Sequence, residues 1–316
     1  MSGVVVWSPE RKFAFELIAK AKELGLGPVT AVALGDAVAN PEEFGKRGAD
    51  QVLTFEDPSL KNLNPETVVD AVTAAAKQTG ATHVFTTATR RGKEVAPRVA
   101  VRLGWAAVSN AAGVRKGDKG LELDRPFMGG KTVATEVPAG NAVVAFSARL
   151  FEPLPENAGA SAKVAKLDLK PAAAKVTITE RKPRPSTGVN LEEAQVVIGA
   201  GRGVKQKDDL KLLQDLADLL GGQIGCSRPL ATDLGWLSDD YWIGLSGKEI
   251  KPKLYVAAGI SGQIQHTTGI RGAKVIVSIN TNKDAPIFKI SDYGVVGDLY
   301  KILPALTAAI KKELGK

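Results

Sequence analysis

Short apolar runs alternate with longer amphipathic segments along both halves of this chain. The apolar runs have the length of buried strands, and the segments between them carry apolar residues at helical spacing. In the first half the expected strands are 4–7, 30–34, 49–55 and 82–89, and the expected helices are 11–25, 41–48, 65–80 and 92–104, the last interrupted by Pro97. In the second half the expected strands are 194–201, 223–227, 254–261, 273–281 and 286–294, with helices at 205–222 and 298–314. This alternation predicts the α/β class, in which largely parallel sheets carry helices on both faces.

Two segments interrupt the alternation and indicate two domains. Residues 121–130, 131–140 and 141–153 look like three short strands joined by glycine turns. We expect them to add antiparallel strands to a sheet edge or to form a small lobe. The charged, proline-containing stretch RKPRPSTG at 181–188 is typical of a linker. The predicted domains are therefore 1–188 and 189–316.

Composition narrows the classes of function. A single cysteine, Cys226, allows neither an intrachain disulfide nor a cysteine-based metal cluster, which fits a reducing cytoplasm. We expect no membrane span, because no run approaches the roughly 20 apolar residues that one needs, and the first residues lack the pattern of a signal peptide. The net charge is +8, but aromatic residues make up only 5% of the chain, too few for base-stacking platforms. We therefore expect no nucleic acid, and an acidic protein partner or an anionic cofactor instead.

Polar or flexible residues follow every expected strand of the second half. These turns contain Arg202, then Ser227 with Arg228, then 259–266, 280–282 and 292–294. Ligands of doubly wound sheets bind at the carboxyl ends of the strands, so a nucleotide-shaped ligand is predicted there. The glycines of GAGRG, 199–203, alternate without the full G-x-G-x-x-G pattern, and an interpretation as a simple tight turn stays open.

His266 is one of only two histidines in the chain. It is either an ordinary core histidine or a donor at the predicted crevice, where it can bond an acceptor that gains negative charge, such as a flavin. Arg228 would add a fixed positive charge with the same effect. We find no G-x-S-x-G elbow and no evident general base, so the pattern favours a redox carrier over a hydrolase. No catalytic residue is predicted.

The segment LYVAAGISGQIQHTTGIRGAKVIVSIN, 254–280, resembles the signature of electron transfer flavoprotein alpha subunits. The resemblance continues in VIGAGRGVK at 197–205, GCSRP at 225–229 and APIFKISDYGVVGDLYKILP at 285–304. In the first half it extends, more loosely, to RPFMGG at 125–130 and VAFSARLFEP at 144–153. It implies that the first domain contacts a homologous beta subunit in a heterodimer, and that the second is a Rossmann-like FAD-binding domain.

The resemblance also implies a set of cofactor-binding positions. They are Arg202, Ser227, Arg228, Ile243, Gly244, Leu245, Ser246, Ser261, Gly262, Gln263, Ile264, Gln265, His266, Asn280, Asp298 and Leu299. His266 would face the flavin C2 carbonyl, Arg228 would lie by the isoalloxazine, and Asp298 would belong to the adenosine end. Residues 261–264 would face the phosphates and the ribityl chain.

One departure concerns the loop 244–248, which reads GLSGK where the family often has G-Q-T-G-K. Ser246 keeps a hydroxyl that can bond flavin N5, whereas Leu245 replaces a polar contact with an alkyl group. Trp236 and Trp242 flank this loop; packing is the ordinary interpretation, and shielding of the cofactor is the alternative. The flavin potential therefore cannot be taken over from relatives.

The resemblance implies an electron carrier rather than an enzyme with its own substrate. It would pass electrons from acyl-CoA dehydrogenases of fatty acid beta-oxidation, or related dehydrogenases, to a quinone oxidoreductase or a similar acceptor. One FAD is expected in this chain, with AMP or a second FAD in the beta subunit. The alternatives are the alpha subunit of a flavin-based bifurcating complex that uses NADH, and a nucleotide-binding protein without a redox role.

Overall fold

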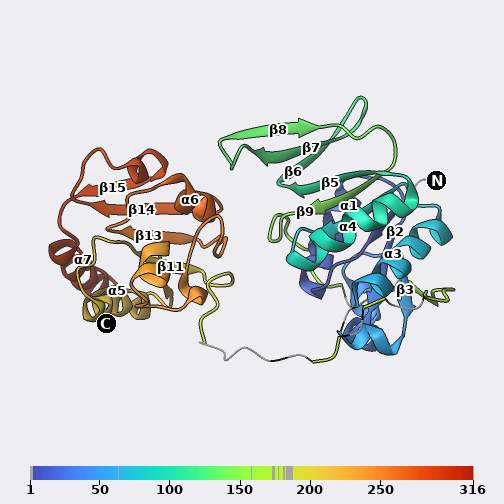
Figure 1. Ribbon diagram of the computed structural model, residues 1–316, viewed down its shortest axis with the longest axis horizontal. Helices are drawn as coiled ribbons and strands as arrows, with labels where there is room; N and C mark the ends of the chain where they lie inside the picture. The colour runs from blue at the N-terminus through green and yellow to red at the C-terminus, as the bar shows by residue number, and fades with distance from the viewer. Residues whose placement is uncertain are drawn as a thin grey trace. The chain divides into compact units, whose positions relative to one another are not determined.

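The computed structural model describes residues 3–62, 64–157, 159–172, 175–176, 178–180, 182 and 188–315. The chain divides into two compact units, one ending at Lys182 and one beginning at Pro183. Each unit is built around its own parallel sheet with helices packed against it (Figure 1). The α/β class with two domains is thus confirmed, whereas most of the expected linker 181–188 lies outside the described residues.

The first unit contains a seven-stranded parallel sheet in the order β10-β3-β2-β1-β4-β9-β5. Its strands are β1 Val4–Val6, β2 Val29–Leu34, β3 Gln51–Phe55, β4 His83–Thr87, β5 Ala106–Ala111, β9 Ala142–Phe146 and β10 Lys163–Lys166. Its helices are α1 Arg11–Glu23, η1 Gly35–Ala39, α2 Glu42–Lys46, η2 Pro58–Asn62, α3 Pro65–Thr79 and α4 Arg90–Leu103. Apolar clusters fill both faces of the sheet, as a parallel sheet requires.

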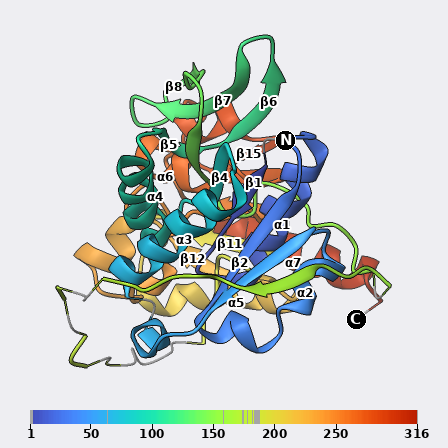
Figure 2. The ribbon, with the colours of Figure 1, turned by 90° about the vertical axis from the view of Figure 1, so that its right-hand side faces the viewer.

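An antiparallel three-stranded sheet, β6-β7-β8, belongs to the same unit and extends beyond β5 (Figure 2). It comprises β6 Gly113–Gly117, β7 Gly120–Phe127 and β8 Thr132–Glu136. Leu121 and Leu123 of β7 are buried in the unit's core, while Phe127 at its end is 49% exposed. We call this sheet the arm.

The structure corrects two expectations in the first unit and adds three strands to it. Helix α4 continues through Pro97, because buried residues on both sides of the proline, Val95 and Val99 among them, hold the helix against the sheet. Strand β9, within 141–153, is not an antiparallel edge strand; it is wholly buried and pairs in parallel with both β4 and β5. Strands β5, β6 and β10 were missed.

The second unit contains a five-stranded parallel sheet in the order β12-β11-β13-β14-β15. Its strands are β11 Val196–Ala200, β12 Gln223–Cys226, β13 Leu254–Ala258, β14 Val275–Asn280 and β15 Tyr293–Val296. Its helices are η3 Lys207–Asp209, α5 Leu210–Leu219, η4 Pro229–Asp233, η5 Asp239–Tyr241, α6 Ile264–Thr267, η6 Thr268–Ile270, η7 Pro286–Ile290 and α7 Leu299–Glu313. Helices α5 and α7 pack side by side on one face, with Leu213 and Leu303 fully buried there (Figure 1). A second apolar cluster, which includes Tyr255, covers the other face.

The expected strand 286–294 is wrong in its bounds. Pro286 opens a 3-10 helix instead, since a proline suits the first turn of a helix and cannot donate in a sheet. Strand β15 begins only at Tyr293. The Asp292 carboxylate accepts a hydrogen bond of 2.8 Å from the Ile276 N–H, near the beginning of β14. Residues 292–294 therefore do not lie in a turn at the carboxyl edge, and Gly297 with Asp298 takes that place.

Within the described part of the chain, we find no helix with the length and hydrophobicity needed to traverse a bilayer.

Candidate functional site

A cavity of about 680 Å³ lies at the carboxyl ends of the five parallel strands of the second unit. The turns after all five strands contribute to it, through Ser227, Arg202, Ser261, Thr281 and Gly297 in sheet order. Neighbouring strands are about 4.8 Å apart, so this edge is about 19 Å long. The volume is typical of a cofactor or ligand site, and the length suits an extended molecule.

Most of the cofactor-binding positions implied by the resemblance meet in this cavity. Those that line it are Arg202, Ser227, Arg228, Ile243, Leu245, Ser246, Ser261, Gln263, Gln265, His266, Asn280, Asp298 and Leu299. Gly244, Gly262 and Ile264 do not line it. Gly244 and Gly262 are buried beneath the turns, against the Gln265 carbonyl and the Ile287 backbone respectively. The two glycines let the turns approach closely; cofactor binding by these three residues, as by the others, stays a prediction.

Sequence reasoning missed several lining residues. Lys205, Gly297 and Tyr300 all line the cavity, as does Thr281 of the expected turn 280–282. The signal for Lys205 was present, because it follows a strand by a few residues. Gly297 and Tyr300 were hidden by the misplaced strand 286–294. Trp242 packs against the core of the second unit and also lines the cavity. Trp236 packs against the same core and does not line the cavity.

The glycines of GAGRG make room for neighbouring protein groups. A Cβ on Gly199 would collide with the Tyr255 hydroxyl. A Cβ on Gly201 or Gly203 would meet the backbone of Gly259 in the adjacent turn. These glycines are therefore required by the packing of β11 and its turn against β13 and its turn. Gly203 also lines the cavity, so the interpretation as a ligand-binding turn stays a prediction beside that of a simple tight turn.

One end of the cavity is formed by the loop 242–248 and the short helix α6. The Leu245 N–H donates to the Gln265 carbonyl over 2.7 Å, which ties the loop to the helix. The Arg228 guanidinium lies 5.5 Å from the centre of the Trp242 ring, a cation–π contact. Leu245 is 50% exposed, so an alkyl group faces the space beside these groups.

His266 lies at the same end and is only 7% exposed. Its Nε2 is 2.8 Å from the Tyr255 hydroxyl. Burial lowers the pKa of His266 to about 4, because the cation would lose its hydration; the Ile243 carbonyl opposes this shift only in part. The imidazole is therefore neutral at pH 7. Its Nδ1 is buried, and no acceptor among the described residues, the nearby Ile243 carbonyl included, meets the geometry of a hydrogen bond with it.

The other end of the cavity is tied together around Tyr300. The Tyr300 hydroxyl donates to the Asp209 carboxylate over 2.5 Å and accepts the Lys205 N–H over 2.8 Å. The Lys205 ammonium lies 5.1 Å from the centre of the Tyr300 ring. Asp298 caps α7 by accepting the Tyr300 N–H over 3.0 Å. The turn after β11 and the beginnings of helices α5 and α7 are thus fixed against one another.

Asn280 holds two turns rather than reaching freely into the cavity. Its amide nitrogen donates to the Ile260 carbonyl, and its amide oxygen accepts the Asn282 N–H, each over 2.9 Å. The side chain orients the backbone of 259–262, in the middle of the cavity.

The charges of the lining fit an anionic ligand. Arg202, Lys205 and Arg228 are exposed at the cavity, against one carboxylate, Asp298. The ion pairs of the described residues leave both arginines without a carboxylate partner. Two free guanidinium groups suit a diphosphate, and the aromatic and aliphatic side chains at the Trp242 end suit a planar ring. The described residues contain no cluster of three or more histidine, cysteine or acidic side chains placed to hold a metal.

Comparison with known proteins covers both units. A family model described as the electron transfer flavoprotein domain matches residues 10–172, and one described as the electron transfer flavoprotein FAD-binding domain matches residues 190–271. The chain is 39% identical to an electron transfer flavoprotein subunit alpha of Syntrophomonas wolfei, over 96% of this chain and 95% of that protein. It is 35% identical to the protein of the same description from Bacillus subtilis, over 96% of this chain and 94% of that protein.

Proposed function

The chain belongs to the family of electron transfer flavoprotein alpha subunits, and from this premise we propose that it binds FAD in the described cavity and carries electrons between other redox proteins. The observation that carries the proposal is the convergence of five polar turns on one elongated cavity, most of whose lining lies in the FAD-binding segment 190–271. FAD supplies the redox chemistry, and the protein supplies binding, orientation and charge.

The two ends of the cavity suggest how FAD lies. Arg202 and the turn 261–264 serve the phosphates and the ribityl chain in this proposal. Asp298, at the Tyr300 end, serves the adenosine. Arg228, beside Trp242, serves the isoalloxazine. His266 donates to the C2 carbonyl, and Ser246 offers its hydroxyl to N5.

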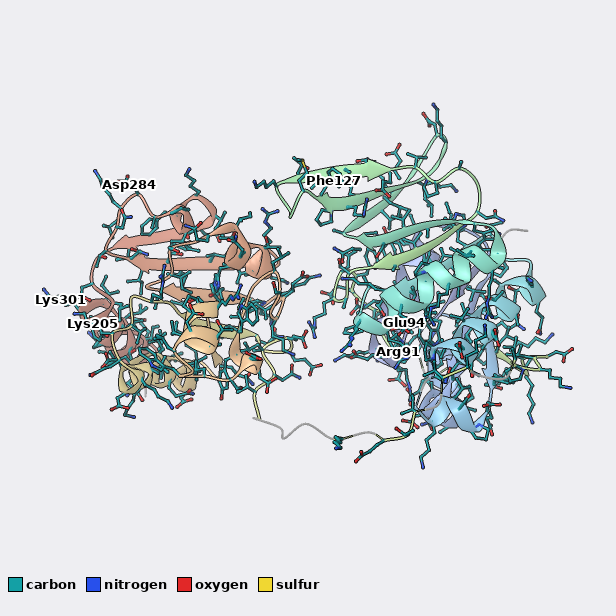
Figure 3. All side chains as sticks on the ribbon, in the orientation of Figure 1. Arg91, Glu94, Phe127, Lys205, Asp284 and Lys301 are labelled. Atoms are coloured by element: carbon teal, nitrogen blue, oxygen red, sulfur yellow. The ribbon has the colours of Figure 1, made fainter. Side chains whose placement is uncertain are left out.

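The first unit supplies a surface for the beta subunit in this proposal. The relatives are described as alpha subunits, which implies a second chain. The arm presents Phe127, labelled in Figure 3, at 49% exposure. Met128 and Val133 of the arm are 67% and 66% exposed. Exposed apolar side chains gathered at one tip are typical of an interaction site. We expect the beta subunit to carry AMP or a second FAD.

The electrons come from acyl-CoA or related dehydrogenases and go to a quinone-linked oxidoreductase or a similar acceptor in this proposal. A cytoplasmic setting is supported by the single, buried cysteine. A bifurcating complex with NADH at the beta subunit is the second candidate. The flavin count separates the two, since the shuttle holds one FAD and one AMP and the bifurcating complex holds two FAD.

The test is to co-express the full-length chain with the beta subunit encoded beside it and to purify the complex. We expect a yellow heterodimer whose extracted nucleotides contain FAD, and whose visible spectrum bleaches on addition of an acyl-CoA dehydrogenase with its substrate. A colourless complex that takes up no added FAD would contradict the proposal.

Replacing Arg228 by glutamine is expected to weaken FAD binding about 10- to 100-fold. A charge-assisted contact of about 1.5–3 kcal/mol is lost with the guanidinium. The one-electron potential should also fall, by about 65 mV for 1.5 kcal/mol, because a positive charge stabilises the reduced ring. Arg228→Lys keeps the charge and should retain most of the potential. FAD titration and potentiometry should compare four proteins: the wild type, Arg228→Gln, Arg228→Lys and Arg202→Gln. An equal fall of the potential in Arg202→Gln and Arg228→Gln would show a charge effect that is not specific to position 228.

A further inference from the structure

Tyr255 lies in the middle of β13, and no part of its side chain is exposed. Its hydroxyl is seated over Gly199 of the neighbouring strand, where any Cβ would collide with it. Tyr255 pairs with Val197 in the sheet, so Gly199 lies two residues along and on the same face. The phenol is therefore held in one place by the sheet itself, next to the cavity and not in it.

The hydroxyl of Tyr255 has one hydrogen-bond partner among the described residues, the Nε2 of His266 at 2.8 Å. A phenol carries one proton, and burial raises the pKa of Tyr255, so the proton stays on the oxygen. The acceptor within reach of that proton is Nε2. An Nε2 that accepts a hydrogen bond carries no proton of its own.

A neutral imidazole has one N–H. If Nε2 accepts from Tyr255, the proton of His266 must be on Nδ1. The opposite tautomer would leave the Tyr255 proton without an acceptor and the Nδ1 lone pair without a donor, two unsatisfied buried groups in place of one. The geometry thus selects the Nδ1–H form.

We infer that Tyr255 is a positioning residue that keeps His266 in the neutral tautomer protonated on Nδ1, so that Nδ1–H is the donor the ring offers to a ligand in the cavity. Nδ1 is the buried nitrogen that makes no hydrogen bond of good geometry in the described chain, although the Ile243 carbonyl is close enough to raise the pKa of the ring, and His266 lines the cavity. The inference rests on the proposed function for the identity of that ligand as FAD. It assigns to the Tyr255 hydroxyl a role that touches no ligand atom.

The tautomer can be measured directly. The chain has two histidines, so ¹⁵N-histidine labelling of the full-length protein with its beta partner gives two pairs of ring nitrogens, and His83→Gln assigns them. We expect the ¹⁵N shifts of His266 to show a protonated Nδ1 and an unprotonated Nε2, with and without FAD. A protonated Nε2 would overturn the inference. Since the FAD-free sample decides this, the result does not depend on the proposed function.

The consequence is measured with Tyr255→Phe, which keeps the volume of the ring and removes the hydroxyl. We expect the Nε2–H tautomer to become populated, FAD to bind about tenfold more weakly, and the one-electron equilibrium constant to fall about tenfold, equivalent to about 59 mV. The matched control is Tyr293→Phe on β15, 66% exposed and outside the cavity, which should change neither quantity.

A double-mutant cycle separates positioning from packing. In a His266→Gln background, Tyr255→Phe should have no further effect on FAD affinity or potential, because its effect passes through the imidazole. An equal loss in both backgrounds would mean that the hydroxyl acts through packing alone and would refute the positioning role. Failure of every variant, wild type included, to bind FAD would instead refute the proposed function and leave the tautomer result standing.

Discussion

Gly262→Ala is expected to abolish the retention of FAD during purification, with an affinity at least about 100-fold lower, or about 2.7 kcal/mol. Gly262 has φ +84°, a conformation that costs an L-residue about 1–2 kcal/mol. A Cβ there would also press on the backbone of Ile287, whose N–H donates to the Ser261 carbonyl over 3.1 Å. The turn that presents Ser261 and Gln263 to the cavity must therefore move.

The control for this variant is Gly235→Ala. Gly235 has φ +62°, but a Cβ there meets nothing within 4 Å. It carries the same kind of backbone strain without the collision, and it does not line the cavity. FAD content per chain, from absorbance after gel filtration, should be near that of the wild type in Gly235→Ala and near zero in Gly262→Ala. Equal FAD contents in the two variants would show that the close approach of the turn to Ile287 is not needed.

Lowering the pH from 7.5 to 5 is expected to destabilise the wild-type protein by about 2 kcal/mol more than the His266→Gln variant. The pKa of His266 is about 4 in the folded protein, against an ordinary 6.5 in the unfolded chain. Between these values the unfolded chain takes up a proton that the folded protein refuses, so stability is lost as pH falls below about 6.5. Above that pH the imidazole is neutral in both states and contributes no slope.

Urea unfolding of the FAD-bound protein at the two pH values, followed by flavin release, measures this difference. His83 is the control for a general histidine effect, because its pKa is also lowered by burial and it stays in the His266→Gln variant. In a His83→Gln variant, the free energy of unfolding should still fall between pH 7.5 and pH 5 by the amount that is due to His266. Parallel slopes in the wild type and in His266→Gln would mean that the ring at 266 is solvated in solution.

The sequence predicted those features whose cause is local. Buried parallel strands such as β2 are continuous apolar runs, and helices such as α3 carry their own stop signal, here Gly80 with φ +62°. Strand β10, KVAK, gave no such signal, because an edge strand with exposed lysines reads like a loop. It becomes a strand only by pairing with β3, from Lys163 opposite Gln51.

In the site, too, features with a local cause could be predicted and features that depend on tertiary contacts could not. The order of polar turns along the sequence was enough to predict where the cavity lies, since the carboxyl ends of parallel strands must share one edge. The bond between Tyr255 and His266 could not be predicted, because it depends on how the turn after β13 folds back over its own strand. The need for a glycine at 199 follows from the position of the Tyr255 hydroxyl on the neighbouring strand, which the sequence does not reveal either.

The place of β9 in the first sheet constrains the order in which the nascent chain can fold. β9 lies between β4 and β5, yet it is synthesised after both and after the whole arm. At 5–20 residues per second, the ribosome needs roughly 2–7 s to pass from the end of β5 to the end of β9. During that time β4 can pair with β1 on one side only, and β5 has no partner in the sheet. Two strand edges therefore remain unpaired, and chaperone engagement or premature self-association would be concentrated in this interval.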